Sequence, residues 1–280
     1  MTQPLSAAKA RDLVRTAALP EVLEVALSRL QELQDPGLRD AILDRFRRLM
    51  EQGPKGDGGG GLRMALLTAL RPIAHAGDVE VFESAVLLIE IGYGKDVVQN
   101  LRAAALVGIA SLDEPRAAWY ATHLLRDREN VSDVTGQPAL TAAQLLVSIG
   151  RPEPLYLEAL RGGGHPEVRA ECVRQLTSLP APLLAKLAEE ILRGDDEPLM
   201  IGLVDLALAH ESLPQLAPVL RVWLQTTDRI DVYRYLVMAA AASRREAAIA
   251  LLRELLPITT DRHKFVALEG ALELLAPSPR

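Results

Sequence analysis

The sequence predicts an all-α protein, and three observations carry that prediction. Apolar residues recur at spacings of three and four along most of the chain, as in Leu183, Leu184, Leu187, Ala188 and Ile191. Apolar and polar residues never alternate with period two for long. Aromatic residues make up only 4% of the chain, so the residues that favour strands are too few to build a sheet.

Prolines and aspartates divide the apolar stretches into about fifteen helices of roughly 10 to 17 residues. Each break supplies one of two things. Either a proline enters the first helical turn, where its missing N–H costs nothing, or an Asp or Ser can cap the next helix. Examples are Leu19-Pro20, Asp113-Glu114-Pro115 and Pro214.

Similar helices recur at offsets of roughly 28 to 39 residues, and such a period is typical of a helical repeat array. A further amphipathic helix lies between each two of them, so the repeating unit is an antiparallel helix pair, present about seven times. One pair cannot bury both faces of its helices, whereas stacked neighbours share a continuous core. The recurring helices have their first apolar positions at Leu62, Leu101, Leu140, Val168, Leu199, Val232 and Phe265, and the intervening helices are expected at 78–91, 114–126, 153–161, 182–193, 213–226 and 245–256.

Three of the recurring helices begin with an aliphatic residue, followed by Arg and then by small or aliphatic residues at one-turn spacing. The pattern is clearest in Pro166-Glu167-Val168-Arg169, and it recurs at Leu62-Arg63 and Leu101-Arg102. It resembles the HEAT repeat family. The resemblance implies a right-handed α-α superhelix, a HEAT-like solenoid of about seven stacked antiparallel helix pairs. Thr141 and Met200 stand at the Arg position in two repeats, which leaves the register there open.

The chain is expected to form one HEAT-like solenoid over residues 1–280. Residues 1–50 are expected to be N-terminal capping helices, 53–61 a flexible Gly-rich loop and 62–280 the repeat array. Deleting Gly56 to Gly60 should therefore leave the melting temperature nearly unchanged. The N-terminal helices would mask an apolar end of the array or pair with a second copy.

Composition excludes several classes of protein. The 280 residues carry a formal net charge of −6, which argues against generic nucleic-acid binding, because phosphate contacts need clustered Lys and Arg. The single cysteine, Cys172, rules out an intramolecular disulfide and is expected to be packed. No apolar run approaches the length of a membrane span, and a secretory signal is not evident, so we expect a cytoplasmic, soluble protein with no membrane partner.

No motif for catalysis, cofactor or metal stands out, and we expect none of these. The glycines of 53–61 lack the preceding strand and the Gly-Lys-Ser/Thr of a phosphate loop. His210-Glu211 is a single pair, whereas the HEAT-like iron hydroxylases need several, and the dipole of a helix end explains His210 equally well. HEAT-like DNA glycosylases need aromatic residues in a basic groove, but Trp119 and Trp223 are expected to be core anchors.

The sequence favours a non-enzymatic scaffold or adaptor that binds another protein or a peptide. The contact surface would be the concave inner-helix face and the edge that carries the helix-connecting turns. A HEAT-like pocket protein, either a bilin-lyase-like enzyme or a small-ligand carrier, stays open as the alternative, and an enclosed apolar cavity would favour it. Arg and Tyr concentrate binding energy, so the candidate partner-binding residues are Arg63, Arg102, Arg169, Tyr233 and Tyr235.

The same turns carry many aspartates, which either cap helices or form an acidic lip for a basic partner or a cation. In repeats of this kind the inner-helix Arg often bonds an Asp of a neighbouring turn, and for Arg169 that partner would be Asp195 or Asp196. The aspartates are Asp57, Asp96, Asp127, Asp133, Asp195, Asp196, Asp228, Asp231 and Asp261.

Overall fold

The computed structural model describes residues 5–127, 130–161 and 163–275, and it is helical nearly throughout. The described residues form sixteen α-helices, a few 3-10 turns and one β-hairpin of two-residue strands. The all-α prediction is therefore confirmed. By its internal contacts the chain divides into two units, Met1–Arg151 and Pro152–Arg280, and each is treated separately below.

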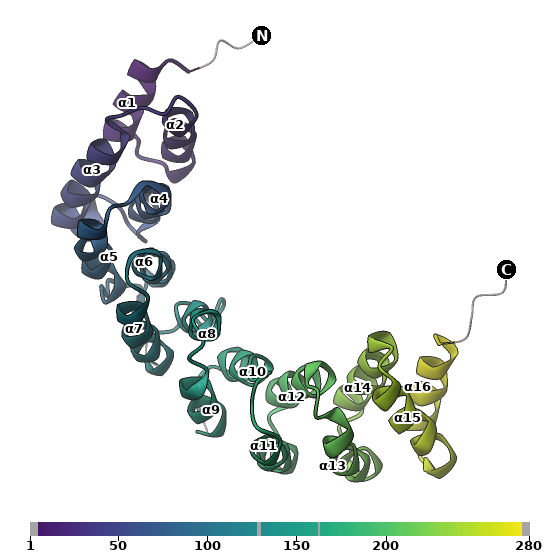
Figure 1. Ribbon diagram of the computed structural model, residues 1–280. Helices are drawn as coiled ribbons and strands as arrows, with labels where there is room; N and C mark the ends of the chain where they lie inside the picture. Colours follow the sequence, from purple (N-terminus) through teal and green to yellow (C-terminus); the bar gives the residue numbers. More distant parts are fainter. Residues whose placement is uncertain (1–4, 128–129, 162, 276–280) are drawn as a thin grey trace. The chain divides into compact units, whose positions relative to one another are not determined.

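Unit 1 contains eight helices and the hairpin (Figure 1). The helices are α1 (Ala7–Thr16), α2 (Pro20–Glu32), α3 (Leu38–Gln52), α4 (Gly61–Leu70), α5 (Val79–Val86), α6 (Gln99–Leu112), α7 (Glu114–Arg126) and α8 (Ala139–Ser148). The hairpin pairs β1 (Ile91–Gly92) with β2 (Lys95–Asp96) between α5 and α6.

Unit 2 also contains eight helices among its described residues. They are α9 (Glu153–Leu160), α10 (Pro166–Arg174), α11 (Ala181–Arg193), α12 (Glu197–Ala209), α13 (Leu213–Thr226), α14 (Ile230–Ser243), α15 (Glu246–Leu255) and α16 (Arg262–Glu273). In both units the helices start within a few residues of the positions that the sequence predicts.

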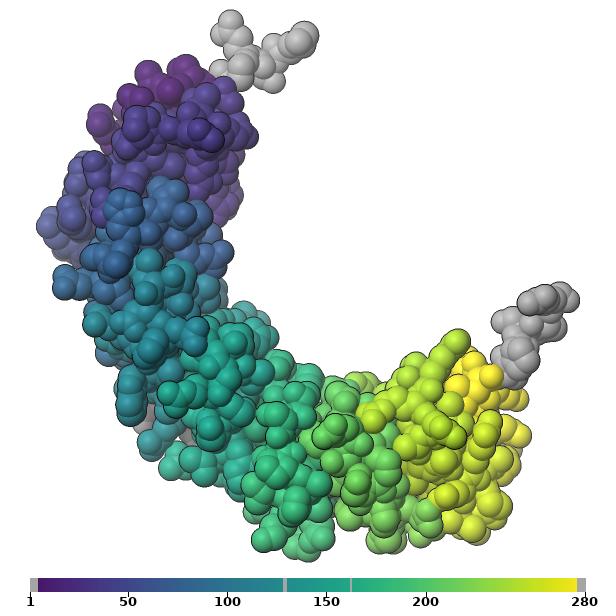
Figure 2. Space-filling view, in the orientation of Figure 1, coloured from purple at the N-terminus to yellow at the C-terminus, as the bar shows by residue number. Residues whose placement is uncertain are grey.

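In each unit the helices lie in two layers (Figure 1). The even-numbered helices pack one against the next, α2 on α4, α4 on α6 and α6 on α8 in unit 1, and α10 on α12, α12 on α14 and α14 on α16 in unit 2. The odd-numbered helices cover one side of that layer, and within each unit side chains fill the gaps between neighbouring helices (Figure 2). Because every helix buries its apolar stripe against the next one along, the core is continuous within each unit.

Local chemistry explains why the helices begin where they do. Ser6, Asp113, Asp196 and Asp261 each accept a hydrogen bond from a backbone N–H in the first turn of the following helix. Such caps satisfy donors that have no partner inside the helix. Prolines stand in the first turn of five of the other helices, α2, α9, α10, α11 and α13.

The segment 53–61, expected to be a flexible loop, is anchored by two buried residues, Asp57 and Gly60, while Pro54, Lys55, Gly58 and Gly59 are exposed. It begins with a 3-10 turn, Gly53–Lys55, and ends at Gly60, whose φ of 72° is in the left-handed region that favours glycine. Between them Asp57 is buried, and its carboxylate accepts hydrogen bonds from the backbone N–H groups of Leu62 and Arg63 at 3.0 and 2.9 Å. Asp57 therefore caps α4 from within the loop.

Deleting Gly56 to Gly60 is now expected to lower the melting temperature, because the deletion removes Asp57 with its cap and its ion pair. A loss of a cap costs about 1 kcal/mol, and the buried Arg63 would also lose a partner. Circular dichroism during heating measures the change. Gly58→Ala is the control, because the added Cβ would meet only the Pro54 carbonyl oxygen at 3.6 Å and should leave the melting temperature unchanged.

Both tryptophans were expected to lie in the core. Trp223 is buried as predicted, but Trp119 is 79% exposed, so its prediction as a core anchor is wrong. The buried side of α7 is formed instead by residues such as Ala117, Ala121 and Leu124. None of the helices in the described segments has the length and apolar character that crossing a membrane requires.

Candidate functional site: a buried arginine ladder and an exposed polar network

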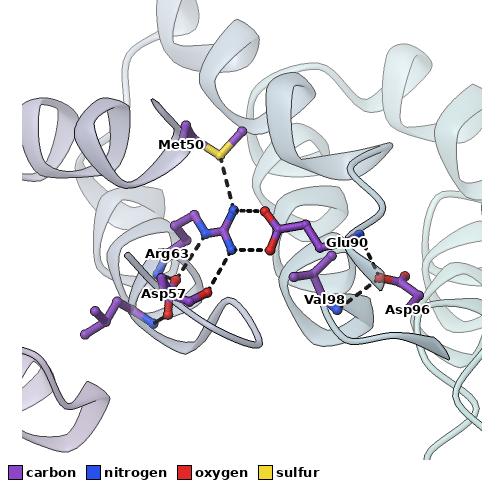
Figure 3. Close-up of polar contacts among 7 residues, drawn as sticks. Met50, Asp57, Arg63, Glu90, Asp96 and Val98 are labelled. Carbon is purple, nitrogen blue, oxygen red and sulfur yellow. Dashed lines mark hydrogen bonds and ion pairs between the residues drawn. The ribbon is translucent and has the colours of Figure 1, made fainter. Parts of the chain in front are cut away.

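Arg63 lies at the centre of a buried ion cluster in unit 1 (Figure 3). Its guanidinium makes two parallel hydrogen bonds to Glu90, at 2.6 and 2.8 Å, and Nε donates to Asp57 at 3.1 Å. The side chain of Arg63 is fully buried, and both carboxylates are at least 92% buried. Burial lowers the pKa of Arg63, but the hydrogen bonds with Glu90 and Asp57 outweigh it and hold that pKa above its ordinary value.

Glu90 points toward Arg63 because the side chains of residues 89–91 point alternately outward and inward. Ile89 and Ile91 are exposed while Glu90, between them, is buried, as expected for the extended segment that leads into the hairpin. Sequence reasoning missed Glu90. A single carboxylate within the apolar run LLIEI was the signal available.

A second cluster surrounds Arg102 on the next even-numbered helix. Its guanidinium donates to Asp96 at 3.2 Å and to Asp127 at 2.6 Å. Asp96 also accepts hydrogen bonds from the backbone N–H groups of Glu90 and Val98, which connects the two clusters (Figure 3). Burial raises the pKa of Asp127, but its hydrogen bonds with Arg102 and Asn130 outweigh this, so that pKa lies below its ordinary value.

In unit 2, an ion pair of the same kind is found among the described residues. Arg169 of α10 donates to Asp196 at 2.6 Å and to the carbonyl oxygen of Ala159 at 3.2 Å. Of the two partners that the sequence allowed for Arg169, the structure shows Asp196 in this role. Asp196 also caps α12 through the N–H of Leu199. We call the three sites of Arg63, Arg102 and Arg169 the arginine ladder.

The turn aspartates divide into two groups. Asp57, Asp96, Asp127 and Asp196 are partners of ladder arginines, and Asp261 caps α16 through the N–H of Lys264. The remaining ones, Asp133, Asp195, Asp228 and Asp231, are exposed. Capping and ion pairing therefore explain the first five, of which Asp261 alone is exposed. The other four could meet a partner as an acidic lip, although Asp133, Asp228 and Asp231 also pair with an Arg or Lys side chain.

The structure places the five candidate partner-binding residues very differently. Arg63, Arg102 and Tyr233 are buried, and Arg169 is nearly so. The desolvated ion pairs explain the burial of the arginines, and packing between helices explains that of Tyr233. In this structure their side chains do not reach the surface, whereas Tyr235 is 39% exposed.

Tyr235 belongs to a polar network on the exposed side of three successive even-numbered helices. Its hydroxyl donates to Asp205 of α12 at 2.6 Å, and Arg174 of α10 donates to the other oxygen of Asp205 at 2.9 Å. Arg174 also pairs with Glu171, which accepts from Gln175 at 2.7 Å. Sequence reasoning missed Arg174 and Asp205. They precede Tyr235 by 61 and 30 residues, close to two repeats and one, and that spacing was the available signal.

Three helices of the corresponding layer of unit 1 have a different surface, whereas the fourth, α2, carries Glu21, Glu24, Arg29 and Glu32. In α4, α6 and α8, all of which are described, the only ionisable residues are Arg63 and Arg102, and both are buried in the ladder. The exposed residues of these helices are neutral and mostly small, such as Thr68, Ser111 and Ser148. The polar and aromatic groups suited to binding thus lie in the even-numbered layer of unit 2.

The contacts of His210 and the burial of Cys172 indicate structural roles for both side chains. The backbone N–H of Ser212 donates to Nδ1 of His210 at 3.0 Å, so Nε2 carries the proton and donates to the carbonyl oxygen of Leu179 at 2.9 Å. Cys172 is fully buried, and burial raises the pKa of its thiol. Its sulfur is therefore not a reactive thiolate at neutral pH.

Acid should weaken unit 1 partly through Asp78, which holds Arg39 with two hydrogen bonds of 2.5 and 3.0 Å. Burial raises the pKa of Asp78, but the bonds from Arg39 and from the His75 N–H outweigh it and leave that pKa lowered. A lowered folded-state pKa stabilises the fold above the unfolded value of about 3.9, and this contribution is lost as pH falls through the folded value.

Asp78→Asn is therefore expected to be less stable than the parent protein at pH 7, and the difference should shrink as the pH falls below about 4. Thermal unfolding between neutral and acidic pH measures it. Asp12→Asn is the control, because Asp12 is exposed and makes no ion pair among the described residues. A difference for Asp78→Asn that stays constant with pH would contradict this account.

Comparison of the chain with protein families, with curated proteins and with solved structures found no match.

Proposed function

We propose that this protein is a non-enzymatic scaffold, a HEAT-like α-solenoid of about seven helix pairs whose even-numbered layer binds a segment of another protein. The ladder supports the repeat. Arg63, Arg102 and Arg169 pair with carboxylates that follow them by 27, 25 and 27 residues. An ion pair that recurs at nearly constant spacing is expected when each pair of helices is tied to the next. A cytoplasmic location remains part of the proposal.

The observation that carries the proposed function is the network of Arg174, Asp205 and Tyr235. It lies on the exposed face of three adjacent helices, and Met238, which is 44% exposed, follows Tyr235 on the same helix. Tyr, Arg and Met are enriched where binding energy concentrates. Because Arg174 and Tyr235 both hold Asp205, they are already ordered before a partner arrives, which lowers the entropic cost of binding.

The cavities support a scaffold over a small-ligand carrier. The apolar void enclosed by residues of α12 to α15 measures about 10 Å³, room for no more than a water molecule. The larger hollows described for unit 1, of about 590 to 890 Å³, are open to solvent. A ligand carrier would be expected to enclose several hundred cubic ångströms of apolar space.

Site-specific photo-crosslinking in the source organism tests the proposal. A photoreactive amino acid at Tyr235 or Met238 should attach to one protein, and the same group at the exposed Glu189 or Glu190 of α11 should not. Tyr235→Ala and Asp205→Ala should then each weaken binding of that purified protein about tenfold or more.

The melting temperature of both variants should change little, because Tyr235 and Asp205 lie outside the buried core. Crosslinks to nucleic acid, or a chromophore or metal bound to the purified protein, would contradict the proposed function. Equal crosslinking from α11 would contradict the proposed surface.

A further inference from the structure

An open groove of about 890 Å³ lies between α3 and α5 on the odd-numbered layer of unit 1. The two helices that border it differ in length. α3 has 15 residues and α5 has 8, which corresponds to about 22 and 12 Å at 1.5 Å per residue. α5 can therefore border only part of the length of α3.

The floor of the groove is apolar. It contains Leu43, Phe46 and Met50 from α3 and Val81 from α5. Leu43 and Phe46 are buried, whereas Met50 and Val81 are partly exposed. A partner placed over them would remove this remaining apolar surface from water.

The rim is acidic. Five carboxylates and two arginines line the groove, a formal net charge of −3. Asp40, Asp44 and Glu51 follow one another on α3 at spacings of four and seven, so they form a stripe along one face, and Glu80 faces them from α5. Arg39 and Arg47 already pair with Asp78 and Asp44. Glu51 and Glu80 make no ion pair with any described residue.

The adjacent hollow between α1 and α3 shows that this charge is local. It shares Asp40, Asp44 and Arg47, but four arginines and three aspartates line it, a formal net charge of +1. Arg11 there is paired with Asp35. Glu51, Asp78 and Glu80 border the α3/α5 groove but not this hollow, so they account for the negative charge that is particular to the groove.

We propose that the α3/α5 groove binds a basic amphipathic helix of a partner protein. An apolar floor with a charged rim is the arrangement by which grooves take amphipathic helices, whose apolar face enters the groove while the polar face meets the rim. The acidic stripe spans twelve residues of α3, from Asp40 to Glu51, so the bound helix has about three turns, with Lys or Arg along both flanks. This site is independent of the Tyr235 surface.

The probe for a test is a fluorescein-labelled peptide of about 14 residues in which Leu forms one helical face and Lys the other. Its anisotropy is measured with the full chain at physiological salt. The groove variant carries Asp40→Lys, Glu51→Lys and Glu80→Lys, all at exposed positions. The control carries Glu189→Lys, Glu190→Lys and Glu211→Lys, which are exposed in unit 2 and change the net charge equally.

The groove variant should bind the probe at least about tenfold more weakly than the parent protein, and the control less than about twofold more weakly. A matching peptide with Glu in place of Lys should show the reverse preference and bind the groove variant more tightly. In the parent protein, the Lys probe should slow hydrogen exchange in α3 and α5. Because this slower hydrogen exchange is measured in the parent protein, it tests the site even if the substitutions disturb folding.

Equal weakening in the groove and control variants would overturn the proposal, because it would show that only the total charge matters. Absence of probe binding to the parent protein, or protection confined to other helices, would overturn it as well.

Discussion

Replacing Arg63 with methionine is expected to destabilise unit 1 by about 3–5 kcal/mol. The substitution keeps most of the apolar stem but removes the charge that Asp57 and Glu90 share, and both carboxylates are almost inaccessible to water. A buried charge that loses its partner retains its full desolvation cost. The loss should appear as a lower melting temperature and as faster hydrogen exchange in α4 and the hairpin.

Two matched variants separate this effect from loss of side-chain volume. Arg193→Met removes an arginine that is 77% exposed and paired only with Glu189 one turn away, and it should cost less than about 0.5 kcal/mol. Adding Glu90→Met to Arg63→Met should restore part of the stability, because one unpaired carboxylate is removed. If the double variant were instead less stable than Arg63→Met by the full cost of a second core substitution, an unpaired carboxylate could not be the cause of the destabilisation in Arg63→Met.

The helical content and the positions of the helices along the chain were predictable from the sequence because they depend on local signals. The three- and four-residue spacing of apolar residues and the positions of Pro and Asp mark each helix, and they do so without any distant contact. The repeat offset also placed Arg63, Arg102 and Arg169 at equivalent positions, as the ladder shows. The division at Arg151 gave no comparable signal in the sequence.

The role of those arginines was less predictable, because it depends on side chains that approach from other turns. An Arg beside a small aliphatic residue looks the same in sequence whether it faces solvent or a buried carboxylate. For Arg63 the buried carboxylate is that of Glu90, which is 27 residues away in the sequence and lies within an extended segment. For the same reason the glycines of 53–61 suggested mobility, although Asp57 among them accepts four hydrogen bonds, two from backbone N–H groups and two from the Arg63 guanidinium.

Whether a side chain on a helix is exposed also depends on which neighbouring helices cover it, and the local sequence does not reveal this. Tyr233 and Tyr235 are two residues apart on α14, so they face opposite ways, and only packing against the neighbouring helices decides which one is buried. Trp119 shows the same limit, since its Leu and Ala neighbours suggested a core position although its own side of α7 is uncovered.

The second large effect is expected at Gly202, where α12 passes very close to α10. A Cβ built on Gly202 would lie 2.5 Å from the carbonyl oxygen of Ala170 and 3.0 Å from its Cα, both backbone atoms that cannot rotate away. Gly202→Ala must therefore move two packed helices apart. Overpacking of this kind costs about 1–3 kcal/mol, and Gly202→Val should cost more.

Gly270 of α16 provides the matched control, because nothing lies within 4 Å of a Cβ built there. Gly270→Ala should stabilise unit 2 by about 0.5–1 kcal/mol, since alanine loses less backbone entropy than glycine in a helix. The two Gly→Ala substitutions thus have opposite expected signs in the same unit. Chemical denaturation of both variants measures the difference, and a stabilising Gly202→Ala would show that α10 and α12 are not in such close contact.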